Sequence, residues 1–292
     1  MAVVVTPENN GMPTSPNYDA NVHTVDDNML FMRWMYDLPT WLLGLLIIGL
    51  FVGLSVVALR YFHRRLHRSA IATLIDNGTV GWFFSGVTLL YGLTLGLLTV
   101  ATWGNYTQSA AIASQEAAAI AALYRDLAGY PIGQQAVLKA ELRDYARFII
   151  EKSWPAQRKG LINENENLVL ETFQNELLTT DLANNEHQAL HAEALRMFNN
   201  MVELRRQRIE SIGGSVPGVL WSVVLLGAIA TLGFSYLFSV KSFRLHATMT
   251  GLLAAMVGLL IFLIVALDHP YWGEVSVTPE AYQRVLSKVM VR

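Results

Sequence analysis

The sequence predicts an all-α integral membrane protein, because four long apolar segments form two pairs on either side of a long polar stretch. The pairs are Leu38–Leu59 with Thr79–Trp103, and Pro217–Val240 with Leu245–Leu267. Each segment is long enough to cross a hydrocarbon core of ~30 Å as a helix, and too long for the roughly ten-residue strands of a membrane barrel. Since lipid offers no hydrogen-bond partners, each segment must satisfy its own backbone as a helix.

The same pattern divides the chain into five parts. We expect a mobile N-terminal tail (residues 1–37), a first transmembrane hairpin (38–103), an extramembrane helical domain (104–216), a second transmembrane hairpin (217–267) and a C-terminal segment (268–292). Breaks at Tyr130–Gly133, at Trp154–Gly160 and near Thr179–Asn184 divide the inserted stretch into four amphipathic segments. They predict a helical bundle.

Composition excludes several functions. The net charge of −2 leaves no basic footprint for nucleic acid, and the absence of cysteine closes disulfide, thiolate-metal and thiol chemistry. The sequence contains no phosphate-binding loop, nucleophile elbow or kinase motif, so we expect neither an enzyme nor a cofactor.

Basic residues predict the orientation in the membrane. The loop after the first span holds Arg60, Arg64, Arg65 and Arg68, and the loop after the third holds Lys241 and Arg244. By the positive-inside rule both short loops are cytoplasmic. The N-terminus, the helical domain and the C-terminus are then extracytoplasmic in a multi-pass protein of the bacterial inner (plasma) membrane.

Small and hydroxyl-bearing residues recur at helical spacing along one face of the second span: Ser85, Thr88, Gly92, Gly96 and Thr99. A Gly-xxx-Gly pair favours close packing of helices, and a polar stripe also suits the lining of a pore, so both interpretations stay open. In the fourth span Ala247, Gly251, Ala255 and Gly258 repeat the pattern, so we expect that helix to pack against another span.

Glu116 falls on the apolar stripe of the first helix of the predicted bundle. An unpaired buried carboxylate is costly, so Glu116 needs a cationic partner. The basic cluster Arg205, Arg206 and Arg208 near the end of the last helix is the candidate. It would form either a structural ion pair or a functional charge at a vestibule.

Ionisable residues are expected only at the edges of the spans, as Asp76, Asp268 and His269, and this disfavours ion-coupled transport. His187 and His191 share a helical face and are weak metal candidates, since a third and fourth ligand are missing. The run Asn163–Asn167 lacks the pattern of a calcium loop and is interpreted as a solvated helix start.

Two stretches, Tyr91–Pro131 and Ala266–Gln283, resemble the bacterial bestrophin-like membrane proteins. The resemblance lies in Glu116-Ala117, Leu123-Tyr124, the stretch from Tyr145 to Trp154-Pro155, and the turn with Asp268, Pro270 and Gly273. The resemblance implies kinship with bestrophins, which are pentameric anion-selective channels with four membrane helices per subunit and a large helical loop between the second and third. Bestrophins keep that loop in the cytosol, whereas the arginines here place it outside. Neither the bestrophin calcium clasp nor its hydrophobic neck is recognisable in the sequence.

The sequence therefore predicts a homo-oligomeric passive ion channel of bestrophin-like type, anion-conducting by this resemblance. Its partners would be the lipid bilayer, further copies of itself (five by analogy) and inorganic ions, with no nucleic acid. The alternative is a non-conducting membrane interaction or scaffold protein whose helical domain binds an envelope partner or lipid.

Overall fold

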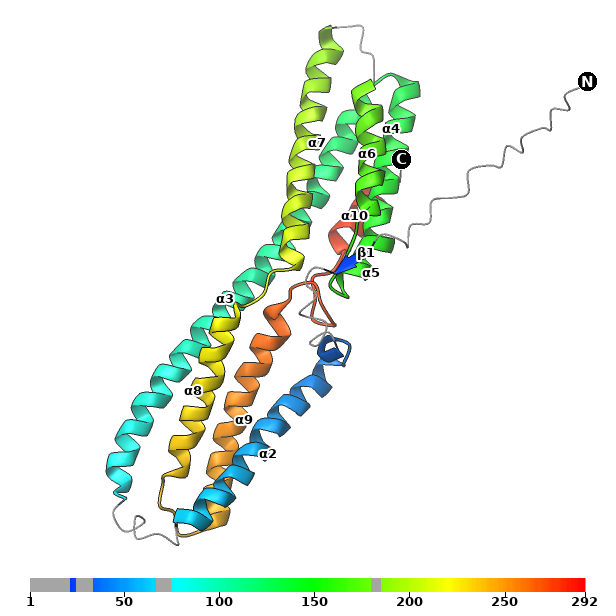
Figure 1. The fold of residues 1–292 in the computed structure, drawn as a ribbon. Helices are drawn as coiled ribbons and strands as arrows, with labels where there is room; N and C mark the ends of the chain where they lie inside the picture. The colour runs from blue at the N-terminus through cyan, green and yellow to red at the C-terminus, as the bar shows by residue number, and fades with distance from the viewer. Residues whose placement is uncertain (1–21, 25–33, 67–74, 180–184, 292) are drawn as a thin grey trace, which may run out of the picture.

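The computed structural model of the protein describes residues 22–24, 34–66, 75–179 and 185–291, and this part is almost entirely helical (Figure 1). Four of its helices are long and apolar enough to cross a membrane: α2 (Thr40–Leu66), α3 (Asn77–Asp126), α8 (Gly218–Tyr236) and α9 (Phe243–Asp268). They coincide with the four apolar segments of the sequence, and they lie side by side in the lower half of Figure 1.

Helix α3 extends through both halves of the molecule. Its 50 residues contain no proline and correspond to a length of ~75 Å. Asp76 caps its start, because the carboxylate accepts hydrogen bonds from the backbone N–H groups of Gly78 (3.1 Å) and Thr79 (2.9 Å). The helix continues without a break past Trp103, where the sequence is expected to leave the membrane, and its upper half lies beside α7 (Figure 1).

The upper half of the molecule is a bundle around the second half of α3. A short 3₁₀ turn (Leu127–Gly129) leads to α4 (Ile132–Phe148), and a π-helical turn (Ile149–Ser153) leads to α5 (Trp154–Gln157). Then come β2 (Leu161–Asn163), α6 (Asn165–Thr179) and α7 (Asn185–Ile212). The helix ends follow the breaks expected at Tyr130–Gly133 and Trp154–Gly160, while residues 180–184 of the third break lie outside the described residues.

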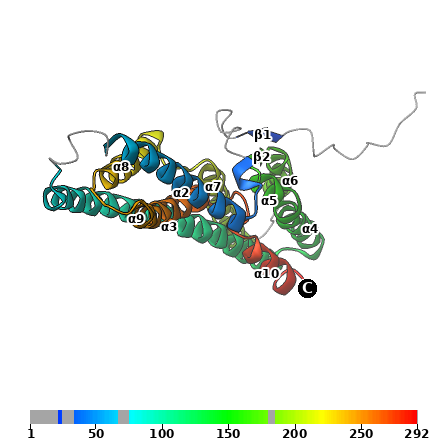
Figure 2. The same ribbon diagram turned by 90° about the horizontal axis from the view of Figure 1, so that it is seen from below.

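Segments from both ends of the chain join this bundle. β1 (Val22–Thr24), which lies within the predicted tail, pairs antiparallel with β2, so that Val22 is opposite Asn163. α10 (Glu280–Lys288) packs against α3 and α4 (Figures 1 and 2). Its buried residues belong to the same hydrophobic core as those of α3, α4, α6 and α7. Neither association is predicted by the sequence.

The membrane helices pack closely where glycine removes a side chain. A Cβ added at Gly258 of α9 would lie 3.2 Å from the Cα of Ile48 in α2. The expectation that α9 packs against another span is therefore confirmed, and the partner is α2. A Cβ at Gly227 of α8 would lie 2.4 Å from Cδ2 of Tyr91 in α3. That ring is held in place, because its hydroxyl donates to the carbonyl of Val224 (3.0 Å).

We expect the substitution Gly227→Ala to destabilise the protein by about 1–3 kcal/mol, because α3 and α8 must separate to accept the methyl group. The measurement is thermal unfolding of the purified protein in detergent. The matched control is Gly233→Ala on the same helix, where an added Cβ meets no atom within 4 Å. Equal unfolding temperatures for the two variants would contradict the assigned α3–α8 contact.

Candidate functional site

The stripe on α3 is not covered by the rest of the subunit. Ser85, Gly92 and Gly96 are exposed, and Thr88 and Thr99 are half-buried. No atom of the described residues lies within 4 Å of a Cβ added at Gly92 or Gly96. The two glycines therefore do not mediate helix packing inside the subunit, and the stripe is open to a neighbouring molecule or to solvent.

The hydroxyl groups of the stripe differ in their hydrogen bonds. The hydroxyls of Ser85 and Thr99 donate to the carbonyls of Gly81 and Leu95 on their own helix, each at 2.8 Å. The Thr88 hydroxyl is buried and has no partner among the described residues. It is thus the hydroxyl of the stripe that has a free donor.

In the bundle half of α3, Glu116 is fully buried and paired with Arg208. The Nε of Arg208 donates to Oε2 of Glu116 (2.6 Å), and its Nη2 donates to Oε1 (3.3 Å). Both side chains have no exposed surface. The hydroxyl of Tyr145 on α4 donates to Oε1 (3.2 Å), and that of Tyr282 on α10 donates to Oε2 (2.9 Å). The carboxylate therefore has four donors from three other helices.

A second buried carboxylate, Glu166 on α6, extends this cluster. Its Oε1 accepts from Nη2 of Arg208 (2.6 Å) and from Nε of Arg205 (2.8 Å). Arg205 also donates to Oδ1 of Asn167 (2.7 Å). The interpretation of Asn163–Asn167 as a solvated helix start is wrong: Asn163, Asn165 and Glu166 are buried, because the two arginines of α7 supply the charge that Glu166 needs.

Arg206 does not belong to the cluster. It is exposed and forms ion pairs with Glu203 and Glu210 on its own helix. Positions 205 and 208 are three residues apart and share a helical face, whereas 206 points elsewhere. The spacing alone could have separated Arg206 from the other two.

Mutual neutralisation keeps the cluster charged despite its burial. Burial alone would raise the pKa of Glu166, but Arg208 and Arg205 more than offset it, and the pKa lies below its ordinary value. Burial alone would lower the pKa of Arg208, but Glu116 and Glu166 raise it well above its ordinary range. The cluster contains two anions and two cations, so it has no net charge to attract an ion.

The predicted histidine pair is only partly visible. His191 is half-buried, and its Nδ1 forms a hydrogen bond of 2.8 Å with the Tyr130 hydroxyl. The side chain of His187 lies outside the described residues. Among the residues that the structure describes, no three His, Cys, Asp or Glu side chains gather as metal ligands would.

One ionisable residue inside the fourth span was overlooked. His246, in the first turns of α9, is buried, and its Nε2 donates to the carbonyl of Ser235 at the end of α8 (2.9 Å). The expectation that ionisable groups lie only at the edges as Asp76, Asp268 and His269 is therefore wrong in detail. The ring joins the ends of α8 and α9 and lies far from the middle of the span.

A second group of buried polar residues lies where the membrane helices meet the bundle. Asp268 accepts from the backbone N–H of Val216 (2.6 Å), and the His269 ring stacks on Trp272 with centroids 3.9 Å apart. Gly160, with φ +69°, lies under Trp272 so closely that a Cβ would be 2.5 Å from the indole. Burial lowers the pKa of His269 to about 4, so the ring is neutral near pH 7.

We expect Glu116→Gln to destabilise the protein by about 3 kcal/mol, because it leaves Arg208 buried with a single carboxylate partner. Thermal unfolding in detergent measures the effect. Glu203→Gln, which breaks the exposed pair with Arg206, is the control and should change stability little. A small effect of Glu116→Gln would show that the ion pair is not an important source of stability.

Acid should destabilise the protein through His269. The unfolded chain binds a proton at this ring near pH 6.5, and the folded chain binds it only near pH 4. Stability from this group is therefore complete above pH 6.5 and falls, by roughly 3 kcal/mol at most, as the pH drops toward 4. In unfolding measured across this range, His269→Phe should remove part of the decline, whereas the control His191→Phe should keep it. Equal pH profiles for His269→Phe and the parent protein would contradict this assignment.

Comparison with known proteins agrees with this architecture. The family profile of the Bestrophin-like domain matches residues 49–282. Among solved structures, the crystal structure of a bacterial Bestrophin homolog from Klebsiella pneumoniae with a leucine-to-threonine mutation is similar, with a TM-score of 0.53 and 12% identity. That match covers 86% of this chain and 97% of the other.

A crystal structure of a membrane protein with a proline-to-alanine substitution is similar with a TM-score of 0.54 and 12% identity, covering 87% of this chain and 98% of that one. No curated protein sequence matches this chain. At this identity the two structures support the fold alone, while the family profile covers most of the chain. The chain belongs to the family of proteins with a Bestrophin-like domain.

Proposed function

We propose that this protein is a homo-oligomeric passive ion channel in which α2 with α3, and α8 with α9, cross the membrane as two hairpins and α3 faces the axis. The helical bundle between α3 and α8 forms a vestibule outside the membrane. Anion conduction is the selectivity that the family likeness favours.

The open stripe on α3 is the observation that carries this proposal. Glycine and hydroxyl groups face away from the subunit at Ser85, Gly92 and Gly96, and they recur there at helical spacing. Small residues let helices of neighbouring subunits approach closely, and hydroxyls can replace part of the hydration shell of an ion.

The distribution of charge supports passive conduction. In the membrane-crossing stretches the ionisable residues lie toward the ends, with His246 in the first turn of α9 and Arg60 in the last two turns of α2. Ion-coupled transporters normally hold such groups near the midplane. The role proposed for Glu116 is structural, since its charge is buried and neutralised by Arg208.

The proposed location of the protein is the bacterial inner membrane, with the helical bundle on the extracytoplasmic side. Arg60, Arg64 and Arg65 at the end of α2 lie at the same end of the molecule as Lys241 and Arg244, and the bundle lies at the other end (Figure 1). Arg68 lies outside the described residues. Basic short loops favour the cytoplasmic side.

A non-conducting scaffold protein is the second candidate, and one observation favours it. Leu89, Leu93 and Val100 are exposed on α3 beside the stripe, with exposed fractions of 60–73%. If these side chains met at the oligomer axis, they would form a dry apolar plug.

The deciding experiment is the reversal potential of the purified protein in a planar bilayer under a potassium chloride gradient. We expect current that reverses near the chloride potential. Thr88→Val and Thr99→Val should change conductance or selectivity, because each replaces a hydroxyl on the stripe by a methyl group of similar size.

The matched control is Thr94→Val. Thr94 is exposed on the same helix but lies off the stripe, and its hydroxyl donates to Leu90 in the same way (2.9 Å). Reversal near the potassium potential would keep the pore and overturn its anion selectivity. Absence of current from a folded oligomer would favour the scaffold protein. If Thr88→Val and Thr99→Val changed conductance and selectivity no more than Thr94→Val does, the proposal that α3 faces the axis would be wrong.

A further inference from the structure

A groove of about 450 Å³ with charged walls lies where the membrane helices meet the bundle. Three segments of the chain line this junction groove: the one that precedes α2, the turn at the end of α5 and the loop that follows α9. Its wall includes two cations, Arg158 and Lys159, and two carboxylates, Asp37 and Glu274. Because the formal charges cancel, the groove suits a ligand that carries both a positive and a negative charge.

Hydrogen bonds hold the walls of the junction groove in place. Nε and Nη2 of Arg158 donate to the carbonyl of Gly273 (3.4 and 3.0 Å), which joins the α5 turn to the loop after α9. Oε2 of Glu274 accepts from the backbone N–H of Thr40 (2.9 Å), which joins that loop to the start of α2. The hydrogen bonds with Thr40, and then the charge of Arg158, hold the pKa of Glu274 below its ordinary value. One cation and one carboxylate are thus used to build the groove.

Asp37 and Lys159 are the charges that are left for a ligand. Both side chains are exposed in the wall of the groove, and neither has a hydrogen-bond or ion-pair partner among the described residues. A carboxylate binds an ammonium group and a lysine binds a phosphate, in each case through a charge-assisted hydrogen bond.

The junction groove lies at the level of lipid headgroups. α2 begins directly after it and is ~40 Å long, which exceeds a hydrocarbon core of ~30 Å. Trp41 and Leu45, in the first two turns of α2, are 66% and 61% exposed. Apolar surface that is open to acyl chains therefore starts within a few residues of the groove, and an exposed tryptophan at a helix start is typical of the membrane interface.

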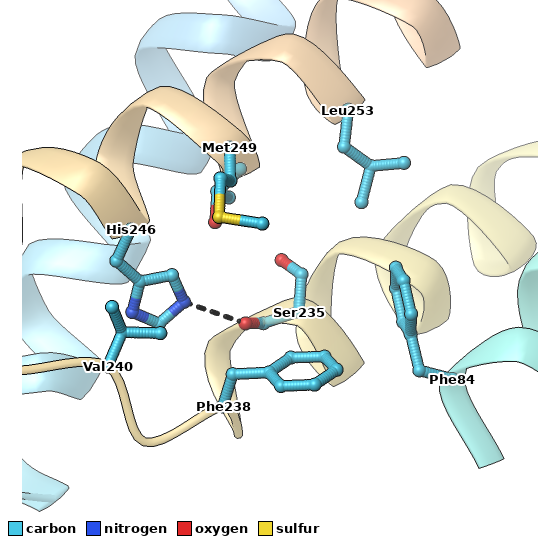
Figure 3. A pocket seen from close by; sticks show the side chains of 8 residues that line it. Phe84, Ser235, Phe238, Val240, His246, Met249 and Leu253 are labelled. Atoms are coloured by element: carbon cyan, nitrogen blue, oxygen red, sulfur yellow. Dashed lines mark hydrogen bonds between the residues drawn. The ribbon is translucent and has the colours of Figure 1, made fainter. Parts of the chain in front are cut away.

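A cavity at the opposite end of the membrane helices differs in its chemistry (Figure 3). Phe84, Phe238 and Leu253 make its wall mostly apolar, and its His246 ring forms a hydrogen bond with the carbonyl of Ser235 (2.9 Å). The described residues that line this cavity include no Lys, Arg, Asp or Glu. The junction groove, in contrast, has the charges that distinguish one headgroup from another.

We propose that the junction groove binds the headgroup of phosphatidylethanolamine, a phospholipid with a phosphate and a primary ammonium group. The phosphate lies against Lys159 and Arg158, and the ammonium group donates to Asp37. The trimethylammonium group of phosphatidylcholine has no N–H to donate, and phosphatidylglycerol has no cation at all. This lipid site requires only that the helices cross a membrane, and it does not depend on ion conduction.

The test is native mass spectrometry of the detergent-purified full chain with dioleoyl phosphatidylethanolamine, phosphatidylcholine and phosphatidylglycerol. These three lipids share acyl chains and differ in the headgroup. We expect phosphatidylethanolamine to bind about tenfold more tightly than either of the others, because it alone makes the further hydrogen bond with the carboxylate.

Two exposed residues of the groove are tested with controls of the same charge. Asp37→Asn should remove the preference over phosphatidylcholine, whereas Lys159→Gln should weaken all three lipids, because each contains a phosphate. The controls are Glu171→Gln on α6 and Lys288→Gln on α10, two exposed side chains of the bundle that do not line the groove. Both should bind lipid like the parent protein.

Glycerophosphoethanolamine, the same headgroup without acyl chains, distinguishes a lipid from a free zwitterion. It should compete about a hundredfold more weakly than the lipid, because it buries no hydrocarbon. Competition at equal concentration would show a site for a soluble ligand and would overturn the lipid assignment.

Equal affinity of the parent protein for the three lipids would overturn the headgroup contact. Unchanged binding by Asp37→Asn and Lys159→Gln would overturn the groove as its site. If these variants change the mass of the oligomer and leave lipid binding unchanged, the groove is a contact between subunits and the proposal is wrong.

Discussion

The ion pair between Glu116 and Arg208 is the interaction on which the arrangement of the helical bundle depends. Taking two charges out of water is costly, and the cost is recovered only where the geometry is good and further hydrogen bonds satisfy the charged groups. Here α3 supplies the anion, α7 the cation, and Tyr145 and Tyr282 the remaining donors. The Glu116 carboxylate therefore has all four of its donors only when the C-terminal helix α10 has docked on α3.

That dependence gives α3 a mechanical role. The helix is continuous, so its membrane half and its bundle half cannot tilt or rotate independently without breaking backbone hydrogen bonds. α7 leads directly into α8, and the segment after α9 carries Tyr271 and Tyr282 into the bundle core. Three of the four membrane helices are thus tied to the same buried cluster. In the proposed channel, a change in the bundle would reach the axis through α3.

Much of the fold could be predicted because its signals are local. Length and hydropathy predicted the four apolar helices, and Pro131 and Pro155 predicted two of the breaks. The pairing of β1 with β2 could not be predicted, since each strand has three residues and the partners are far apart in sequence. The burial of Glu166 was also missed, because Arg205 and Arg208 supply its charge partners from another helix. Glu116 was identified because it interrupts an apolar stripe. The role of Gly92 could not be predicted in the same way, because what covers it depends on molecules outside the subunit.

The orientation in the membrane rests on different physics from the fold. Internal packing is the same whichever side the bundle faces, so likeness to a bestrophin structure at 12% identity carries no information about sides. The short loops do carry such information, because cationic side chains are retained on the cytoplasmic face during insertion. In this chain the basic ends of α2 and α9 lie together at the end opposite the bundle. The charges therefore favour the proposed extracytoplasmic placement of the bundle.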